Sequence, residues 1–212
     1  MIDILVPALG ETIYMSFVST FLAVLIGFFI AIILILTSKG GLRQNLKVYS
    51  TLDVVVNTLR SFPFIILMIV LFPLTKFLIG KSIGTTAAII PLTIGAAPFI
   101  ARLIESAFKE VDKGVIEAAK SFGASDWQII FKVMFVEALP SIISAITLTL
   151  ITVIGFSAMA GAVGGGGLGD VAIKYGYYRF QTDTMIYTVL ILIGLVQVCQ
   201  SVGDYLYKIT KK

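Results

Sequence analysis

The 212-residue sequence contains no histidine and one cysteine, and only 13% of its residues carry a charge. The single cysteine, Cys199, excludes a disulfide framework within the chain. Hydrophobic residues make up 58% of the composition, which is more than the core of a soluble domain of this length can bury. The scarcity of charge therefore excludes an ordinary soluble protein and favours one that exposes apolar surface to lipid.

Ionisable side chains are also missing from the middle of the apolar segments. Histidine is absent, and the carboxylates closest to those segments lie near their ends: Asp53, Glu105, Glu137 and Asp204. Proton-coupled carriers use ionisable residues near the centre of the membrane. A self-contained ion-driven carrier is therefore disfavoured. The net charge of +4 indicates no nucleic-acid partner.

Apolar runs of about 20 residues, the length that crosses a bilayer as a helix, recur along the chain. We predict an all-α membrane protein with five transmembrane helices, near residues 13–36, 54–74, 84–104, 138–160 and 185–206. No linker or low-complexity segment interrupts this pattern, so residues 1–212 are expected to form a single domain. The first residues lack Lys and Arg and the first apolar run is long, so no cleavable signal peptide is expected.

The distribution of basic residues predicts the orientation of the chain. They gather in the first connection, in the third connection with its edges, and at the C-terminus: Lys39, Arg43, Lys47, Arg102, Lys109, Lys113, Lys120, Lys132, Lys208, Lys211 and Lys212. The opposite side has only Lys76, Lys81, Lys174 and Arg179. Because cytoplasmic loops of membrane proteins are enriched in Lys and Arg, we predict that the N-terminus is outside and the C-terminus is cytoplasmic.

The stretch KGVIEAAKSFGASDW, residues 113–127, is polar in an otherwise apolar chain. It predicts a short cytoplasmic helix between spans three and four, with an apolar face formed by Val115, Ile116, Ala119 and Phe122. Glu117 is expected in the first turn, Gly123 suits a left-handed C-terminal cap, and Ser125 to Gln128 form a capping box for the next helix. A helix of about eight residues is unstable alone. It therefore packs on its own spans or inserts into another protein.

Two stretches match phosphate-binding loops but lack their structural context. TKFLIGKS, residues 75–82, ends like a P-loop but has Thr75 where the first glycine should stand. GGGGLG, residues 164–169, has the spacing of a dinucleotide-binding loop, yet it follows a predicted membrane span rather than a strand. The sequence thus predicts no nucleotide site, no ATPase activity of its own and no bound cofactor.

Residues that break or thin the predicted spans are candidates for a pathway or a hinge. Pro91 and Pro98 each remove a backbone hydrogen bond from span three, and Gly95 lies between them, which predicts a kinked helix or a flexible pore wall. Arg60 in span two either extends its charge toward the membrane surface or lines the inner mouth of a pathway. Span four contributes further pathway candidates with hydroxyl groups: Thr149, Thr152 and Ser157.

Small residues around Met159 would allow two helices to approach closely: Ser157, Ala158, Ala160, Gly161 and Ala162. Met159 is the long, flexible apolar side chain among them. It is either a packing residue or, if two copies of the chain meet here, a gate. Further along, KYGYYRF (residues 174–180) is an aromatic and basic patch, which is either a membrane-interface belt or a docking surface for an outer partner.

The EAAKSFG stretch resembles the EAA loop of ABC importer permeases, with Glu117, Ala118, Ala119 and Gly123 in matching positions. Other stretches are similar to the permease subunits of methionine-uptake ABC importers: LRSFPFIIL, PLTIGAAPFIAR, LITVIGFSAMAGAVGGGGLGD and the YGY that follows. The length and the five predicted spans also agree with that family, so the similarity covers essentially the whole chain.

The resemblance implies a type-1 ABC transporter permease domain in a bacterial inner membrane. Its implied partners are a second copy of the chain in a homodimer, two cytoplasmic ATP-binding-cassette ATPase subunits and an extracytoplasmic substrate-binding protein. The short polar helix would be the coupling helix that contacts the ATPase through Val115, Ile116, Glu117, Ala118, Ala119, Phe122 and Gly123. The cargo would be methionine. The alternatives are a permease for another small amino acid or solute, a stand-alone channel or carrier, and a membrane scaffold.

Overall fold

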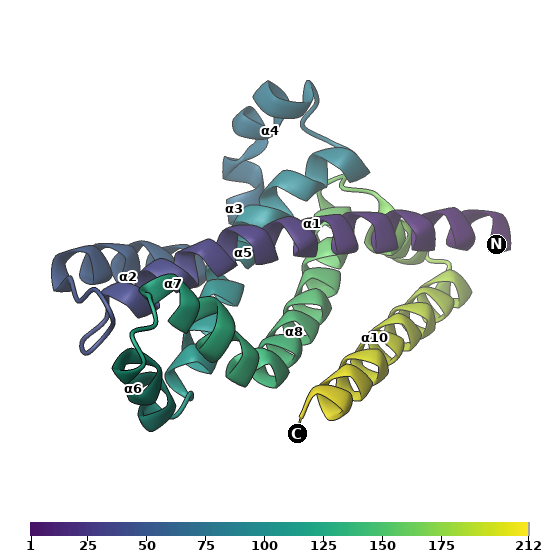
Figure 1. Cartoon of the computed structure of the whole chain (residues 1–212). Coiled ribbons are helices and arrows are strands. Elements are labelled where there is room, and N and C mark those ends of the chain that lie inside the picture. The colour runs from purple at the N-terminus through teal and green to yellow at the C-terminus, as the bar shows by residue number, and fades with distance from the viewer. Residues whose placement is uncertain (212) are drawn as a thin grey trace.

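The computed structural model describes residues 1–211, and all regular structure in that range is helical. The elements in chain order are α1 (Ile2–Thr37), α2 (Leu46–Ser61), α3 (Phe64–Val70), α4 (Phe72–Ile79), α5 (Thr85–Lys109), α6 (Lys113–Ser121), α7 (Asp126–Gln128), the π-helical segment η1 (Ile129–Met134), α8 (Phe135–Ala162), α9 (Gly167–Val171), the π-helical segment η2 (Ala172–Tyr177) and α10 (Thr182–Thr210). The helices cross one another in an open arrangement, with α3 and α4 on one side of α1, and with α6, α8 and α10 on the other (Figure 1).

The centre of the fold is the contact between α1 and α5, which run in the same direction. Gly27 lies against Ala97, Ile100 and Ala101, because a Cβ built at Gly27 would be only 2.5 Å from Ile100 Cγ2 and 2.8 Å from the carbonyl oxygen of Ala97. In a membrane, where lipid removes the hydrophobic drive between helices, such close approach through small residues is a main source of helix association.

The second half of the chain packs on this pair through α8. Phe64 of α3 stacks on Phe156 of α8 with ring centroids 4.3 Å apart, and Gly95 of α5 leaves room for the Phe64 ring. At its C-terminal end α8 touches α9 at backbone distance, because a Cβ on Gly161 or Gly169 would overlap the opposite backbone. This confirms that the small residues near Met159 allow close approach, although the approach seen here is within one chain.

The second predicted span, residues 54–74, is not one straight helix. The chain bends by 103° between α2 and α3, and a further short helix, α4, follows. Pro63 explains the break, because it lacks an N–H and disfavours the helical conformation of the residue before it. Phe62 is accordingly extended, with φ −71° and ψ 127°. Within residues 1–211, four helices are long and apolar enough to cross a membrane, or up to five if the bent pair counts as one.

Other predicted boundaries also differ from the structure. Span one, predicted as residues 13–36, begins eleven residues earlier in α1, and the predicted residues 138–160 belong to a helical segment that runs from Asp126 through η1 into α8. The prolines of span three do not interrupt α5, which continues across both Pro91 and Pro98. Hydropathy marks the apolar part of a helix and not the residue at which the helix begins or ends.

We expect Gly27→Ala to destabilise the protein, whereas Gly10→Ala on the same helix should not. A methyl group at Gly27 would overlap Ile100, and overpacking costs about 1–3 kcal/mol. A methyl group at Gly10 meets nothing within 4 Å, and Ala has a higher helix propensity than Gly. The measurement is the thermal unfolding midpoint of the two variants in detergent. Equal midpoints would contradict the α1–α5 contact.

Candidate functional site

The polar stretch that interrupts the apolar chain forms α6, a helix capped at both ends. The carboxylate of Asp112 accepts hydrogen bonds from the backbone N–H groups of Gly114 (2.7 Å) and Val115 (3.4 Å). Gly123 ends the helical stretch with φ +76°, a conformation that favours glycine, which confirms the predicted left-handed cap. The prediction for Glu117 is wrong, because α6 begins at Lys113 and places Glu117 beyond the first turn. Asp112 supplies the negative charge there.

The predicted apolar face of α6 is divided between two environments. Ile116 and Ala119 pack against the hydrophobic core of the chain. Val115 is 42% exposed and Phe122 is 91% exposed. Part of the face therefore holds α6 on its own chain, while the remainder is a small apolar surface without a partner among residues 1–211.

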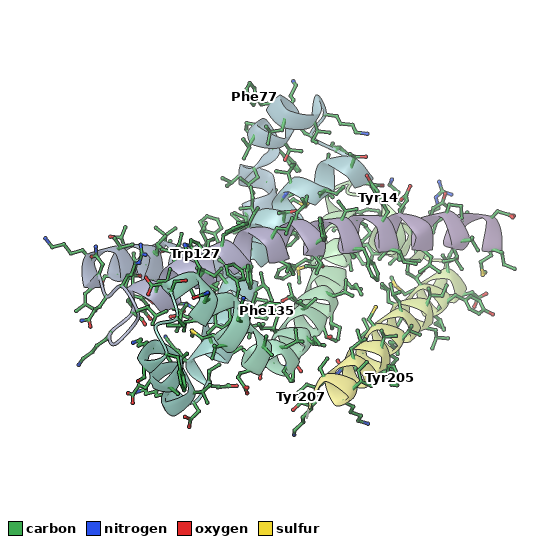
Figure 2. The ribbon with its side chains drawn as sticks, viewed as in Figure 1. Tyr14, Phe77, Trp127, Phe135, Tyr205 and Tyr207 are labelled. Carbon is green, nitrogen blue, oxygen red and sulfur yellow. The ribbon has the colours of Figure 1, made fainter. Side chains whose placement is uncertain are left out.

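The next segment fastens α6 to the rest of the molecule. Ser125 and Gln128 form the predicted capping box, with the Ser125 N–H donating to Gln128 Oε1 at 2.8 Å. Arg43 Nε donates to Asp126 Oδ2 at 2.5 Å, which links the α1–α2 connection to α7. Trp127 of α7 stacks on Phe131 with ring centroids 5.7 Å apart, and Figure 2 labels it at this end of the molecule.

An ionic network around the buried carboxylate of Glu105 joins α2 to α5 at the same end. Glu105 is only 2% exposed and accepts from Arg102 at 2.6 Å and from Lys109 at 2.7 Å. The Tyr49 hydroxyl donates to Glu105 Oε1 at 3.1 Å, and Arg102 also pairs with Asp53. Because Glu105 has two partners of opposite charge, the network offsets the cost of removing its carboxylate from water.

Sequence reasoning missed this network and treated Asp53 and Glu105 as carboxylates at the ends of spans. The spacing of Arg102, Glu105 and Lys109 places all three on one helix face, and that signal was available. The contribution of Tyr49 and Asp53 was not available, because it depends on how α2 lies against α5.

The glycine-rich stretch at the opposite end is a structural turn. Gly164, Gly166 and Gly167 all have positive φ, and they lead into the N-terminus of α9. Glu11 Oε2 accepts from the Gly167 N–H at 2.7 Å, and Thr12 Oγ1 accepts from the Leu168 N–H at 2.9 Å. The chain's own carboxylate thus occupies the position that a phosphate would take in a nucleotide-binding loop.

The other phosphate-loop look-alike, residues 75–82, is a helix end. Thr75 is buried within α4, and Gly80 has the left-handed conformation that terminates this helix. The stretch forms no strand–loop–helix unit, which agrees with its rejection as a P-loop. Figure 2 shows Phe77 of the same segment pointing outward at the tip of the α3–α4 region.

The pathway candidates fall into two groups. Pro91, Pro98, Thr149 and Ser157 are buried within the chain, and the hydroxyls of Thr149 and Ser157 donate to carbonyls of their own helix at 2.7 Å. Arg60 is exposed in the last turn of α2, next to the bend. Because the hydroxyls of Thr149 and Ser157 are buried and already hydrogen-bonded, they are not available to contact a solute.

Met159 belongs to an exposed stripe on α8. The exposed members Leu148, Gly155, Met159 and Ala162, with the half-buried Thr152, repeat at intervals of three or four residues and so share one helix face. Met159 is 49% exposed. The stripe has no partner among residues 1–211, and it contains two of the residues predicted for a gate or pathway.

The aromatic and basic patch lies at the η2–α10 connection. Tyr177, Tyr178 and Phe180 are exposed, and the Arg179 guanidinium lies 4.6 Å from the ring centroid of Tyr175. Phe180 has φ +54°, which is uncommon for a bulky residue. The patch therefore exposes three aromatic rings and one basic side chain on the surface of the chain.

Together, the long apolar helices and the capped helix at one end define a multi-pass α-helical membrane protein. The family of binding-protein-dependent transport system inner membrane components matches residues 23–212, and the chain belongs to this family. The family description and the apolar helices place the protein in a bacterial inner membrane.

Individual relatives agree over most of the chain. The probable D-methionine transport system permease protein MetI of Vibrio cholerae is 52% identical over 97% of this chain and 92% of its own length. The methionine import system permease protein MetP of Bacillus subtilis is 52% identical over 85% of this chain and 81% of its own length. A chain of the inward-facing MetNI methionine ABC transporter superposes with a TM-score of 0.99 at 44% identity, covering 100% of this chain and 98% of that chain.

We expect Glu105→Ala to destabilise the protein by about 1–3 kcal/mol, because the change removes the buried acceptor shared by Arg102, Lys109 and Tyr49, while Arg102 keeps its pair with Asp53. Glu137→Ala removes an exposed carboxylate from α8 and serves as the control. Denaturant unfolding in detergent measures both variants. A loss for Glu105→Ala no larger than that for Glu137→Ala would show that the network does not stabilise the fold.

Proposed function

We propose that the chain is the permease subunit of an ATP-binding-cassette importer and that its cargo is methionine. The relatives named above support the cargo. The observation that carries the coupling role is α6, a capped helix that presents Val115 and Phe122 to the outside while Ile116 and Ala119 hold it on the chain. A rigid apolar projection of this kind is suited to a groove on another protein.

The assembly we propose contains two copies of the chain, two cytoplasmic ATPase subunits and an extracytoplasmic substrate-binding protein. Within the predicted contact segment, residues 115–119 with Phe122 and Gly123, the exposed Val115, Ala118 and Phe122 would contact the ATPase directly, and Ile116 and Ala119 would hold the helix on its own chain. The chain itself would hydrolyse no ATP, and the capping of α9 supports this, because the Gly167 and Leu168 N–H groups at the glycine-rich turn already donate to Glu11 and Thr12. The energy would come entirely from the ATPase subunits.

The orientation we propose has α6 and the C-terminus in the cytoplasm and the N-terminus outside. The α1–α2 connection and α6 lie at the same end of the molecule, as the Arg43–Asp126 ion pair requires, and most basic residues of the connections belong to this end. The positive-inside tendency therefore supports the assignment.

In the transport cycle, closure of the ATPase subunits on ATP would draw the two α6 helices together. The Arg43–Asp126 pair and the packing of Ile116 would carry that displacement to α1 and to the core. The bend near Arg60 and the Pro91–Gly95–Pro98 segment of α5 would act as hinges. The transporter would then alternate between an inward-facing and an outward-facing conformation. Nucleotide and the substrate-loaded binding protein would each change the relative populations of the two.

The gate we propose is the exposed stripe of α8, with Met159 from each copy closing the path. A long, flexible thioether can plug a narrow opening and move aside. Thr152 on the same stripe would line the path. Thr149 and Ser157 would support the wall from within, since their hydroxyls are buried and bonded to their own helix.

Gly123→Asp should abolish methionine uptake and uncouple ATPase activity from it, without preventing membrane insertion. Gly80→Asp is a matched control, because Gly80 also ends a helix with positive φ and also has open space around its Cβ position. The test compares uptake and ATP hydrolysis in vesicles that contain the permease, its ATPase and its binding protein. Normal uptake by Gly123→Asp, or equal loss in both variants, would contradict the coupling role of this segment.

A Met159→Cys variant in a Cys199→Ser background should form a disulfide between two copies of the chain in at least one nucleotide state. Val202→Cys, on an exposed part of α10, is the control and should give little dimer. Non-reducing electrophoresis of the vesicle-reconstituted complex provides the measurement. Absence of the crosslink in every nucleotide state would exclude the gate.

A further inference from the structure

A cavity of about 630 Å³ lies beside α6, a size within the usual range of small-molecule sites. It is open on one side and is lined by the α1–α2 connection, the ends of α1 and α5, Tyr49 of α2, the inner side of α6, and η1. Much of its lining is apolar, and includes Ile35, Leu36, Leu42, Phe108, Val111 and Met134. The cavity is therefore suited to a ligand with a hydrocarbon part.

Basic side chains line the same cavity: Lys39, Lys109, Lys113 and Lys120. Lys109 is paired with Glu105, whereas the other three pair with no carboxylate among residues 1–211. Glu117 is the acidic residue of the lining. The excess of positive charge selects for an anionic ligand.

The cavity also lies at the level where the spans leave the membrane. The apolar helix α1 ends at Thr37 and α5 ends at Lys109, and residues next to both ends line the cavity. Phospholipid phosphates are found at this level, with the acyl chains directly beside the last apolar turns. A ligand that is anionic at one end and apolar at the other is abundant at this position.

The two sides of α6 face different surroundings. Residues 113, 116, 117 and 120 line the cavity at helical spacing, while Val115, Ala118 and Phe122 are exposed on the outer side. A ligand in the cavity would therefore leave the outer side of α6 free for another protein.

We propose that this cavity binds an anionic phospholipid, with the phosphate among Lys39, Lys113 and Lys120 and an acyl chain against the apolar lining. The apolar lining distinguishes a lipid from free phosphate, which would use only the lysines. The bound lipid would connect the end of α1, the end of α5 and α6, so it would stabilise the position of α6. This site is additional to the transport role proposed above and does not depend on it.

Native mass spectrometry of the purified complex tests the proposal, with phosphatidylglycerol and phosphatidylcholine added in separate samples. The variant is Lys39→Gln combined with Lys120→Gln. The control is Lys47→Gln combined with Lys132→Gln, which removes the same charge from exposed lysines that do not line the cavity. A third sample contains phosphatidylglycerol with an excess of inorganic phosphate.

We expect phosphatidylglycerol to remain bound more tightly than phosphatidylcholine. The cavity variant should weaken phosphatidylglycerol binding by roughly 10- to 30-fold, since each lysine near an anionic lipid contributes about 1 kcal/mol, and the control variant should match the unmodified protein. Inorganic phosphate should not displace the lipid. Equal weakening by both variants, equal binding of the two lipids, or displacement by phosphate would overturn the proposal.

Discussion

The close approach of α1 and α5 is the constraint on which the rest of the structure depends. Gly27 allows the two backbones to meet, and the surfaces of this pair provide the support on which the bent α2–α3 segment and α8 pack. A membrane supplies no hydrophobic drive between helices, so steric fit and a few satisfied polar contacts must hold them together. A larger residue at the crossing point would displace every element that packs on it.

Polar contacts at one end of the α1–α5 pair determine how α6 is held. The Glu105 network fastens α2 to α5, and the Arg43–Asp126 pair fastens the α1–α2 connection to α7. Ile116 then seats α6 against the core. Movement of α6 therefore cannot remain local, because the same contacts reach two of the long helices. At the other end, Glu11 and Thr12 hold α9 by its backbone N–H groups.

Much of the architecture could be predicted from residue patterns. Apolar runs identified the membrane class and four or five candidate spans. The Ser125–Gln128 capping box and the Gly123 cap placed the ends of the short helices, because caps act over a few residues. The 103° bend after Ser61 was missed because hydropathy does not record direction, although Pro63 marked the position. The start of α1 was misplaced because hydropathy marks only the apolar part of a helix, whereas α1 extends to Ile2 and includes Glu11, which accepts from the Gly167 N–H at the start of α9.

The sequence by itself determined that this chain belongs in a membrane and that it has a short capped helix between its third and fourth predicted spans. It also determined that the two stretches resembling phosphate-binding loops lack the strand–loop–helix context of such loops. These properties follow from composition and local spacing, which act within one helix or one turn. Only the tertiary structure decided that Phe122 is exposed while Ile116 is held, that Asp53 and Tyr49 complete a network with Glu105, and that the cavity beside α6 is lined by lysines. Each of these depends on side chains from helices distant in the chain, whose relative positions are set by packing and not by any local pattern.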